Sequence, residues 1–377
     1  MFCYWIINIL SVCLASVFFA GILIPKILLI AFRKRLFDVP DARKIHHVAV
    51  PRLGGIAFKP VIFLSIALCL GINLSLGNGR MLLSLDGDVC TLAFGYCCMV
   101  VLYLVGMADD LIGIRYRAKF VIQILCGLMF VAGGLGMTGL YGLFGVHGIP
   151  VWLGASITVL AVVFIINSIN LIDGIDGLAS GLSAVALVFY GVSFFIMGAY
   201  FYSMLSFSAL GVLIPFFYYN VFGNAERGRK IFMGDTGSLT IGVLLCFLGM
   251  KLLADLPEEN SLHVNPFVLA FSPLIVPCFD VVRVFIHRIR KGCNPFLPDK
   301  SHIHHKLLAL GMSQRSAMIT IVVSSFVITA TNVALSGLCN ITVLLLADVA
   351  FVTGMNVWLS GRIRKKSSNI ECNQNTK

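Results

Sequence analysis

Long apolar segments recur along the whole chain and constrain its fold more than any other feature. A bilayer core about 30 Å thick needs roughly 20 apolar residues in each spanning helix. Inside the bilayer the backbone must satisfy its own hydrogen bonds, so such segments fold as helices. They lie near residues 4–25, 53–76, 89–107, 119–138, 151–169, 178–198, 200–222, 237–254, 266–287, 316–338 and 340–360. The sequence therefore predicts an all-α polytopic membrane protein with about 10–11 transmembrane helices.

The composition excludes an ordinary soluble domain. Hydrophobic residues make up 59% of the chain and charged residues 12%, a balance typical of membrane proteins. The first segment lacks the basic start and the cleavage site of a signal peptide, so we expect it to remain as a helix. Residues 1–362 are predicted to form a single integral-membrane domain, and residues 363–377 a polar cytoplasmic tail.

The basic residues are concentrated in alternate connections. Residues 33–52, 108–119, 223–236, 283–315 and the tail from 361 hold 24 of the 28 Lys and Arg residues. Because positively charged loops stay in the cytoplasm, we predict that the N-terminus lies outside and that these connections are cytoplasmic. All the polar motifs described below then share one membrane face, which favours chemistry at that face over a path through the midplane.

A polar motif ends the apolar run that starts at Val151. Its polar residues recur every third position: Asn167, Asn170, Asp173 and Asp176. If the helix continued, they would share one face that rotates slowly around the helix axis. We expect Gly174 and Gly177 to break the helix and to let a ligand approach the backbone. Ionisable groups at membrane depth are a functional-site hypothesis by default. The alternative is a polar connection between two helices.

Two further acidic motifs lie at expected helix ends. Asp109 and Asp110 close the third segment, where both can serve one site as a coupled base or metal-binding pair; the alternative is a solvated helix end. Asp235 stands between Gly234 and Gly237 just before another apolar helix. That stretch can cradle an anion and supply a hard oxygen ligand for Mg²⁺, or it can be an ordinary capped helix start.

Basic and histidine-rich loops complete the set. Arg43, Lys44 and Arg52 can hold phosphates or can simply anchor the neighbouring helices by their positive charge. The three histidines of the last large loop are His302, His304 and His305. Their spacing fits zinc poorly, and contacts to a nucleotide diphosphate suit them better.

Several charges fall inside apolar segments. We expect Lys59 to extend toward the cytoplasmic surface, and Asp280 to pair with Arg283 three residues later. Asp348 has no partner that the sequence reveals.

These groups together can join a Mg²⁺-bound phosphate compound to a lipid phosphate. The two anions repel each other, so a divalent metal and cationic side chains are needed before one can attack the other.

At this point the sequence resembles a known family, the polyprenyl-phosphate N-acetylhexosamine-1-phosphate transferases. The resemblance extends from Asp38 to about Ser316. It rests on five motifs in order: Arg43-Lys44 with Pro51-Arg-Leu-Gly-Gly55, Asp109-Asp110, Asn170-Leu-Ile-Asp-Gly-Ile-Asp-Gly177, Phe232-Met-Gly-Asp-Thr-Gly-Ser238 and Asp299-Lys-Ser-His-Ile-His-His305. Within the family the chain is similar to the bacterial undecaprenyl-phosphate N-acetylglucosamine-1-phosphate transferases that start O-antigen, common-antigen or teichoic-acid synthesis.

The resemblance implies a reaction and a role for each motif. A UDP-N-acetylhexosamine would donate its phospho-sugar to undecaprenyl phosphate and release UMP, with Mg²⁺, or alternatively Mn²⁺, as the cofactor. Asp235 and Asn170 would contact the metal, and Asp173 and Asp176 would organise metal and nucleotide. Asp109 or Asp110 would deprotonate or position the lipid phosphate. The substrate would be bound by Asn167, Arg43, Lys44, Arg52, His302, His304 and His305.

The resemblance also implies a setting and leaves two rivals. The protein would be a multi-pass protein of the bacterial inner membrane with its site in the cytoplasm and without nucleic-acid partners. A homodimer is an alternative to a monomer. One rival is the phospho-muramoyl-pentapeptide transferase of the same superfamily. The other belongs to a different class, the secondary transporters, in which charges lie at the midplane.

Overall fold

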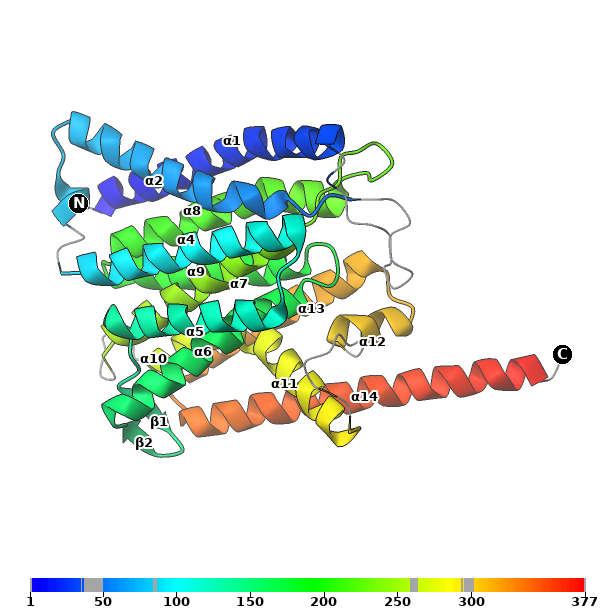
Figure 1. Ribbon diagram of the computed structural model, residues 1–377. Helices are drawn as coiled ribbons and strands as arrows, with labels where there is room; N and C mark the ends of the chain where they lie inside the picture. Colours follow the sequence, from blue (N-terminus) through cyan, green and yellow to red (C-terminus); the bar gives the residue numbers. More distant parts are fainter. Residues whose placement is uncertain are drawn as a thin grey trace.

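The computed structural model is a bundle of long helices and describes residues 2–34, 36, 50–83, 87–257, 264–292, 294 and 302–375. Its longer helices cross the bundle in alternating directions (Figure 1). They are α1 (Phe2–Lys34), α2 (Phe58–Ser75), α4 (Val89–Ile112), α5 (Tyr116–Ala132), α6 (Val151–Ile172), α7 (Leu178–Ile196), α8 (Tyr200–Phe217), α9 (Gly234–Asp255), α11 (Ile275–Arg290), α13 (Gln314–Leu335) and α14 (Ile341–Asn375).

Ten helical stretches of the described residues are long and apolar enough to cross a membrane. The predicted segments all correspond to helices, and α5, with 17 residues, is the one that falls below spanning length. The segment predicted at 266–287 is broken: a short α10 (Pro266–Phe271) and a 3₁₀ turn (Ser272–Leu274) precede α11. Pro273 lies in that break, where its missing N–H and fixed φ disfavour a continuous helix.

Helix α9 forms the centre of the bundle. Its residues are buried continuously from Thr236 to Leu253, and α4, α6 and α7 pack around it. A helix that is apolar on every side must be enclosed by other helices. Helices α1 and α8 form the most extensive helix pair and flank this centre together with α2 (Figure 1).

Several connections lie together at one end of the bundle, which we call the site end. There α1, α4 and α6 finish, and α2, α7 and α9 begin. The N-terminus lies at the opposite end, the far end, while α14 projects past the bundle at the site end (Figure 1). The side of the membrane that each end faces stays a prediction.

A small hairpin at the far end was not predicted. Strands β1 (Gly139–Leu143) and β2 (Val146–Gly148) are antiparallel, and their turn contains Phe144 at φ 53° and Gly145 at φ 74°. The sequence prediction extended the fourth segment to residue 138, whereas α5 ends at Ala132 and Gly134 adopts φ +86°. Left-handed glycine is a common helix terminator.

The intramembrane charges find partners within the bundle. Arg283 Nη2 donates to Asp280 Oδ1 at 2.8 Å, which confirms the predicted pair. Asn332 donates to Asp348 at 2.7 Å. Lys59 contacts α4, since its ammonium lies 5.3 Å from the ring centres of both Tyr96 and Tyr103; its extension toward the cytoplasmic surface stays a prediction. Two aromatic faces attract the cation and hold it against the neighbouring helix.

Candidate active site

The end of α4 caps the beginning of α9. Asp110 Oδ1 accepts a hydrogen bond from the Asp235 backbone N–H at 2.8 Å, and Oδ2 accepts from the Thr236 N–H at 2.8 Å and hydroxyl at 2.6 Å. A carboxylate at a helix N-terminus satisfies unpaired amides and opposes the positive end of the helix dipole. Gly234, at φ +70°, allows this approach, because a Cβ there would lie 2.6 Å from Asp110 Oδ2.

A lysine joins the other carboxylate of this pair to Asp235. Lys119 Nζ, from the first turn of α5, donates to Asp109 Oδ2 at 2.6 Å and also to Asp235 Oδ2. Asp109 Oδ1 accepts the Ile114 N–H at 2.6 Å. Asp109 and Asp110 therefore face different partners: one carboxylate contacts a cation beside Asp235, and the other holds the helix that carries Asp235.

Asn170 brings the end of α6 to the same point. Its Nδ2 donates to Asp235 Oδ1 at 3.0 Å and to Ser238 Oγ at 2.8 Å. Three helices, α4, α6 and α9, and the start of α5 thus meet at the Asp235 carboxylate.

The predicted helix break after Asn170 is confirmed. Helix α6 ends at Ile172, and α7 follows Gly177, which adopts φ +78°. The buried Asn220 fixes this loop, since its Oδ1 accepts the Gly177 N–H at 2.6 Å and its Nδ2 donates to the Ile231 carbonyl at 2.8 Å. The loop of residues 173–177 is thereby tied to the connection that leads into α9.

The two aspartates of this loop have different environments. Asp176 pairs with Lys230 at 2.6 Å, with both side chains largely buried. Asp173 is open to solvent and has no hydrogen-bond partner among the described residues. Although this side chain is exposed, the surrounding protein still displaces part of its hydration water. That desolvation, followed by the negative charges of Asp235 and Asp176, raises the pKa of Asp173 to about 7. Asp173 is thus a carboxylate that a bound cation would stabilise.

Part of the first basic loop lies beside these carboxylates. The Phe232 N–H donates to the Pro51 carbonyl at 2.9 Å, and the Gly54 N–H donates to the Phe232 carbonyl at 3.0 Å. Gly55 and Gly237 are so close that a Cβ on Gly55 would lie 2.0 Å from the Gly237 nitrogen. The exposed Arg52 is held in this pairing, and its charge opposes the raised pKa of Asp173. The predicted phosphate ligands Arg43 and Lys44 lie outside the described residues.

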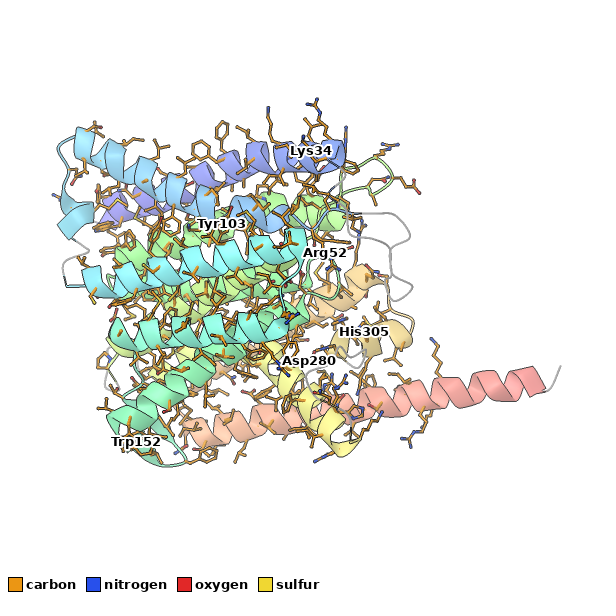
Figure 2. All side chains as sticks on the ribbon, in the orientation of Figure 1. Lys34, Arg52, Tyr103, Trp152, Asp280 and His305 are labelled. Carbon is orange, nitrogen blue, oxygen red and sulfur yellow. The ribbon has the colours of Figure 1, made fainter. Side chains whose placement is uncertain are left out.

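The histidines form the opposite side of the 173–177 loop. They begin α12 (Ile303–Ala309), and Figure 2 shows His305 at the same end of the bundle as Arg52 and Asp280. His304 is 1% exposed, and neither ring nitrogen has a hydrogen-bond partner among the described residues. Its ring packs on Gly174, where a Cβ would lie 2.4 Å from Nε2. Burial, followed by the neighbouring His305 and His302, lowers the pKa of His304 to about 3.

One predicted site residue lies apart from this group. Asn167 Nδ2 donates to Gln123 Oε1 at 2.6 Å and to the Val163 carbonyl at 2.7 Å. Asn167 therefore joins α6 to α5 one turn before Asn170, which is the residue that reaches Asp235.

Sequence reasoning missed two residues of the site. Lys119 was counted only as a basic residue near a membrane boundary, although it is the one charge at the start of the fourth apolar segment. Asn220 was overlooked as a polar residue at the end of an apolar run. Each is a polar group at the edge of a segment, a signal that identifies neither its partner nor its role.

The oxygen donors suit a hard cation without forming a closed cage. No group of three His, Cys, Asp or Glu side chains among the described residues is gathered closely enough to hold a metal. Asp173, Asp235 and Asn170 nevertheless offer carboxylate and amide oxygens around a site with unbalanced negative charge. Mg²⁺ usually takes one or two carboxylates and completes its shell with water and substrate phosphates, so an open donor set of this kind fits it.

Comparison with known proteins is consistent with this geometry. The family model for glycosyl transferase family 4 matches residues 92–253, a range that includes all the acidic residues of the site. A Bacillus subtilis (strain 168) protein named probable undecaprenyl-phosphate N-acetylglucosaminyl 1-phosphate transferase is 31% identical over 358 residues, which is 93% of each chain. The Yersinia pestis undecaprenyl-phosphate alpha-N-acetylglucosaminyl 1-phosphate transferase is 30% identical over 78% of this chain and 76% of its own. The Escherichia coli (strain K12) protein of the same name is 29% identical over 81% and 77%.

Proposed function

Because the chain belongs to glycosyl transferase family 4, in the group of polyprenyl-phosphate N-acetylhexosamine-1-phosphate transferases, we propose that it transfers N-acetylglucosamine 1-phosphate from the UDP-sugar to undecaprenyl phosphate and releases UMP. The observation that carries the proposal is the meeting of Asp109, Lys119 and Asp235 at one end of a membrane bundle, beside Asp173, which has no hydrogen-bond partner among the described residues.

An apolar cavity that extends from the far-end hairpin along α6 toward the site supports a lipid substrate. Its volume is about 320 Å³, and it lies among β1, α6, α10, α11, α13 and α14. Phe164 and Ile165 line it one to two turns before Asn170, and Phe279 lines it next to Asp280. An isoprenyl chain is apolar and flexible, so this cavity can hold part of it while the phosphate reaches the end of α6.

The cationic side chains prepare the two phosphates for reaction. Both substrates are anionic, and Arg52 and Lys119 would reduce their mutual repulsion near Asp235. Asp110 already accepts three protein hydrogen bonds, so we assign it to holding α9. Asp109 is then the carboxylate better placed to position or deprotonate the lipid phosphate. Asp176 would hold Lys230 and the loop near the nucleotide.

Mg²⁺ would be held by Asp235, Asn170 and Asp173, and it would supply positive charge to the transferring phosphoryl group. The lipid-phosphate oxygen would attack the sugar-linked phosphorus in line and expel UMP. The bond between sugar C1 and oxygen survives, so the anomeric configuration is kept. We propose a single displacement because no Cys or Ser of the described site has an activating base beside it; the Ser238 hydroxyl, for example, donates to the Gly234 carbonyl at 3.0 Å and accepts from Asn170.

We propose that the site end faces the cytoplasm of a bacterial inner membrane, because the basic connections lie there. The product would be the first lipid-linked intermediate of a cell-surface polysaccharide.

The decisive experiment is a mass measurement of the lipid product. Purified protein in lipid discs with undecaprenyl phosphate and Mg²⁺ is offered UDP-N-acetylglucosamine, other UDP-N-acetylhexosamines or UDP-muramoyl-pentapeptide. We expect a lipid diphosphate carrying N-acetylglucosamine and an equal amount of UMP. A product with the muramoyl peptide alone would assign the rival transferase activity. Substrate uptake into sealed vesicles without any lipid product would assign a transporter.

A further inference from the structure

Asp280 on α11 is a buried carboxylate with a full set of partners. It is 4% exposed. Its Oδ1 accepts from Arg283 Nη2 at 2.8 Å and Nε at 3.2 Å and from the Ile303 backbone N–H at 3.0 Å, and its Oδ2 lies 2.8 Å from His302 Nδ1. A buried carboxylate is stable only when its oxygens are satisfied in this way.

These contacts determine which nitrogen of His302 carries the proton. Asp280 is ionised, because a guanidinium and a backbone N–H already donate to it, and a carboxylate can only accept. His302 Nδ1 must therefore donate. In the neutral ring the remaining nitrogen, Nε2, then carries the lone pair, and it has no hydrogen-bond partner among the described residues.

The same contacts connect α11 with the 173–177 loop. The rings of His302 and His304 are parallel within 8°, with their centres 5.7 Å apart. His304 in turn packs on Gly174, next to Asp173. Asp280 is therefore joined to the loop that carries Asp173 by a continuous chain of packed side chains.

We propose that Asp280 is a positioning residue that presents His302 Nε2 as a hydrogen-bond acceptor for the sugar nucleotide. The proposal rests on the proposed function. The group recognised is a hydroxyl or N–H donor of that substrate, since a lone pair repels phosphate oxygens. His302 thereby selects a different part of the substrate from Arg52 and Lys119, which attract its phosphates.

A double-mutant cycle tests whether Asp280 acts through His302. We expect Asp280→Asn and His302→Ala each to lower kcat/KM for the UDP-sugar about tenfold, the usual effect of losing one useful hydrogen bond. The KM for the lipid phosphate should be unchanged, and the double variant should be no worse than His302→Ala alone. Asp255→Asn, which changes a carboxylate of the far end, should stay within about twofold of the wild type. Losses that multiply, or no loss in Asp280→Asn, would overturn the proposal.

A spectroscopic measurement decides the matter even if Asp280→Asn does not fold. Long-range proton–nitrogen correlation NMR of protein with isotope-labelled histidine reports the tautomer of each ring, and the His302 signals are those absent from His302→Ala. We expect protonated Nδ1 and unprotonated Nε2 in the wild type, and protonated Nε2 would overturn the proposal. This result does not depend on turnover. Absence of transfer by the wild type would defeat the proposed function alone, while transfer with the wrong tautomer would defeat this inference alone.

Discussion

Two lysine–aspartate clusters lie at opposite ends of the α4–α9 pair. At the site end Lys119 bridges Asp109 of α4 and Asp235 of α9. At the far end Lys251 of α9 bridges Asp88, which precedes α4, and Asp255, at 2.5 and 2.8 Å. Each cluster places one ammonium between two carboxylates and ties the same two helices together.

The neighbours of the two clusters differ. The Lys251 side chain is 7% exposed and packs 5.1 Å from the ring centre of Tyr202, so the far cluster is enclosed. The site cluster is more open and lies beside Asp173, whose charge no described residue neutralises by a hydrogen bond. The same charge arrangement can therefore stabilise a fold or bind a ligand. A neighbouring charge that no described residue satisfies by a hydrogen bond, as at Asp173, indicates ligand binding.

The largest difference should come from removing one carboxylate charge at each end. We expect Asp235→Asn to lower kcat about 100-fold or more, because it removes charge stabilisation at the reacting phosphate, while the protein still inserts in the membrane. Asp88→Asn should retain near-wild-type turnover. Transfer assays at saturating Mg²⁺ compare the two variants. Equal rates in Asp235→Asn and wild type would refute the metal assignment.

The lysines should separate activity from stability. Lys119→Met should reduce kcat/KM about 10- to 100-fold, because a charge-assisted contact to phosphate is lost. Lys251→Met should keep kcat but lower the free energy of unfolding by about 1–3 kcal/mol, because two partly buried carboxylates lose their partner. Thermal unfolding in detergent and transfer assays on both variants provide the measurements. If Lys119→Met lost stability but kept its activity, the site cluster would be structural, like the far cluster.

The sequence predicted where the site lies better than how it is built. Helix ends follow from the length of the apolar segments, and the grouping of polar motifs at one face follows from the charge of the loops. Both are local properties of the sequence. The helix break at Gly174 and Gly177 was predictable because glycine often ends a helix. The different roles of Asp109 and Asp110 were not, because they depend on which helix each carboxylate faces.

Pairings between distant segments were beyond the reach of the sequence. Lys119 contacts Asp235 across 116 positions, and nothing in the local pattern around either residue identifies the other. The same holds for Asn220 and the 173–177 loop. Side-chain direction on packed helices decides such contacts, and that direction depends on the whole bundle.

The pH dependence of activity should follow Asp173 and not the far cluster. Its raised pKa, about 7, means that the carboxylate becomes protonated as the pH falls through neutrality. The free energy of unfolding should also fall as the pH rises from the ordinary pKa of an aspartate toward 7, because Asp173 ionises less readily in the folded protein than in the unfolded chain. Activity at low Mg²⁺ should therefore decline below about pH 7. Higher Mg²⁺ should move this decline to lower pH, because metal and proton compete for the same oxygen.

Profiles of kcat/KM against pH at two Mg²⁺ concentrations test this expectation. Asp88→Asn should show the wild-type profile, whereas Asp173→Asn should lose both the decline and its response to Mg²⁺. A decline that does not move with Mg²⁺ would remove Asp173 from the metal site.

The smallest effect should come from Asn167, which lies one helical turn from Asn170. Asn170→Ala should reduce turnover strongly because it removes the amide beside Asp235. Asn167→Ala should change kcat/KM by less than about threefold and lower the free energy of unfolding by about 1 kcal/mol, because Gln123 loses its partner. Transfer assays and thermal unfolding of both variants measure these effects. A tenfold rise in the KM for the UDP-sugar in Asn167→Ala would return Asn167 to the substrate-binding set, since a residue that only joins α5 to α6 cannot discriminate between ligands.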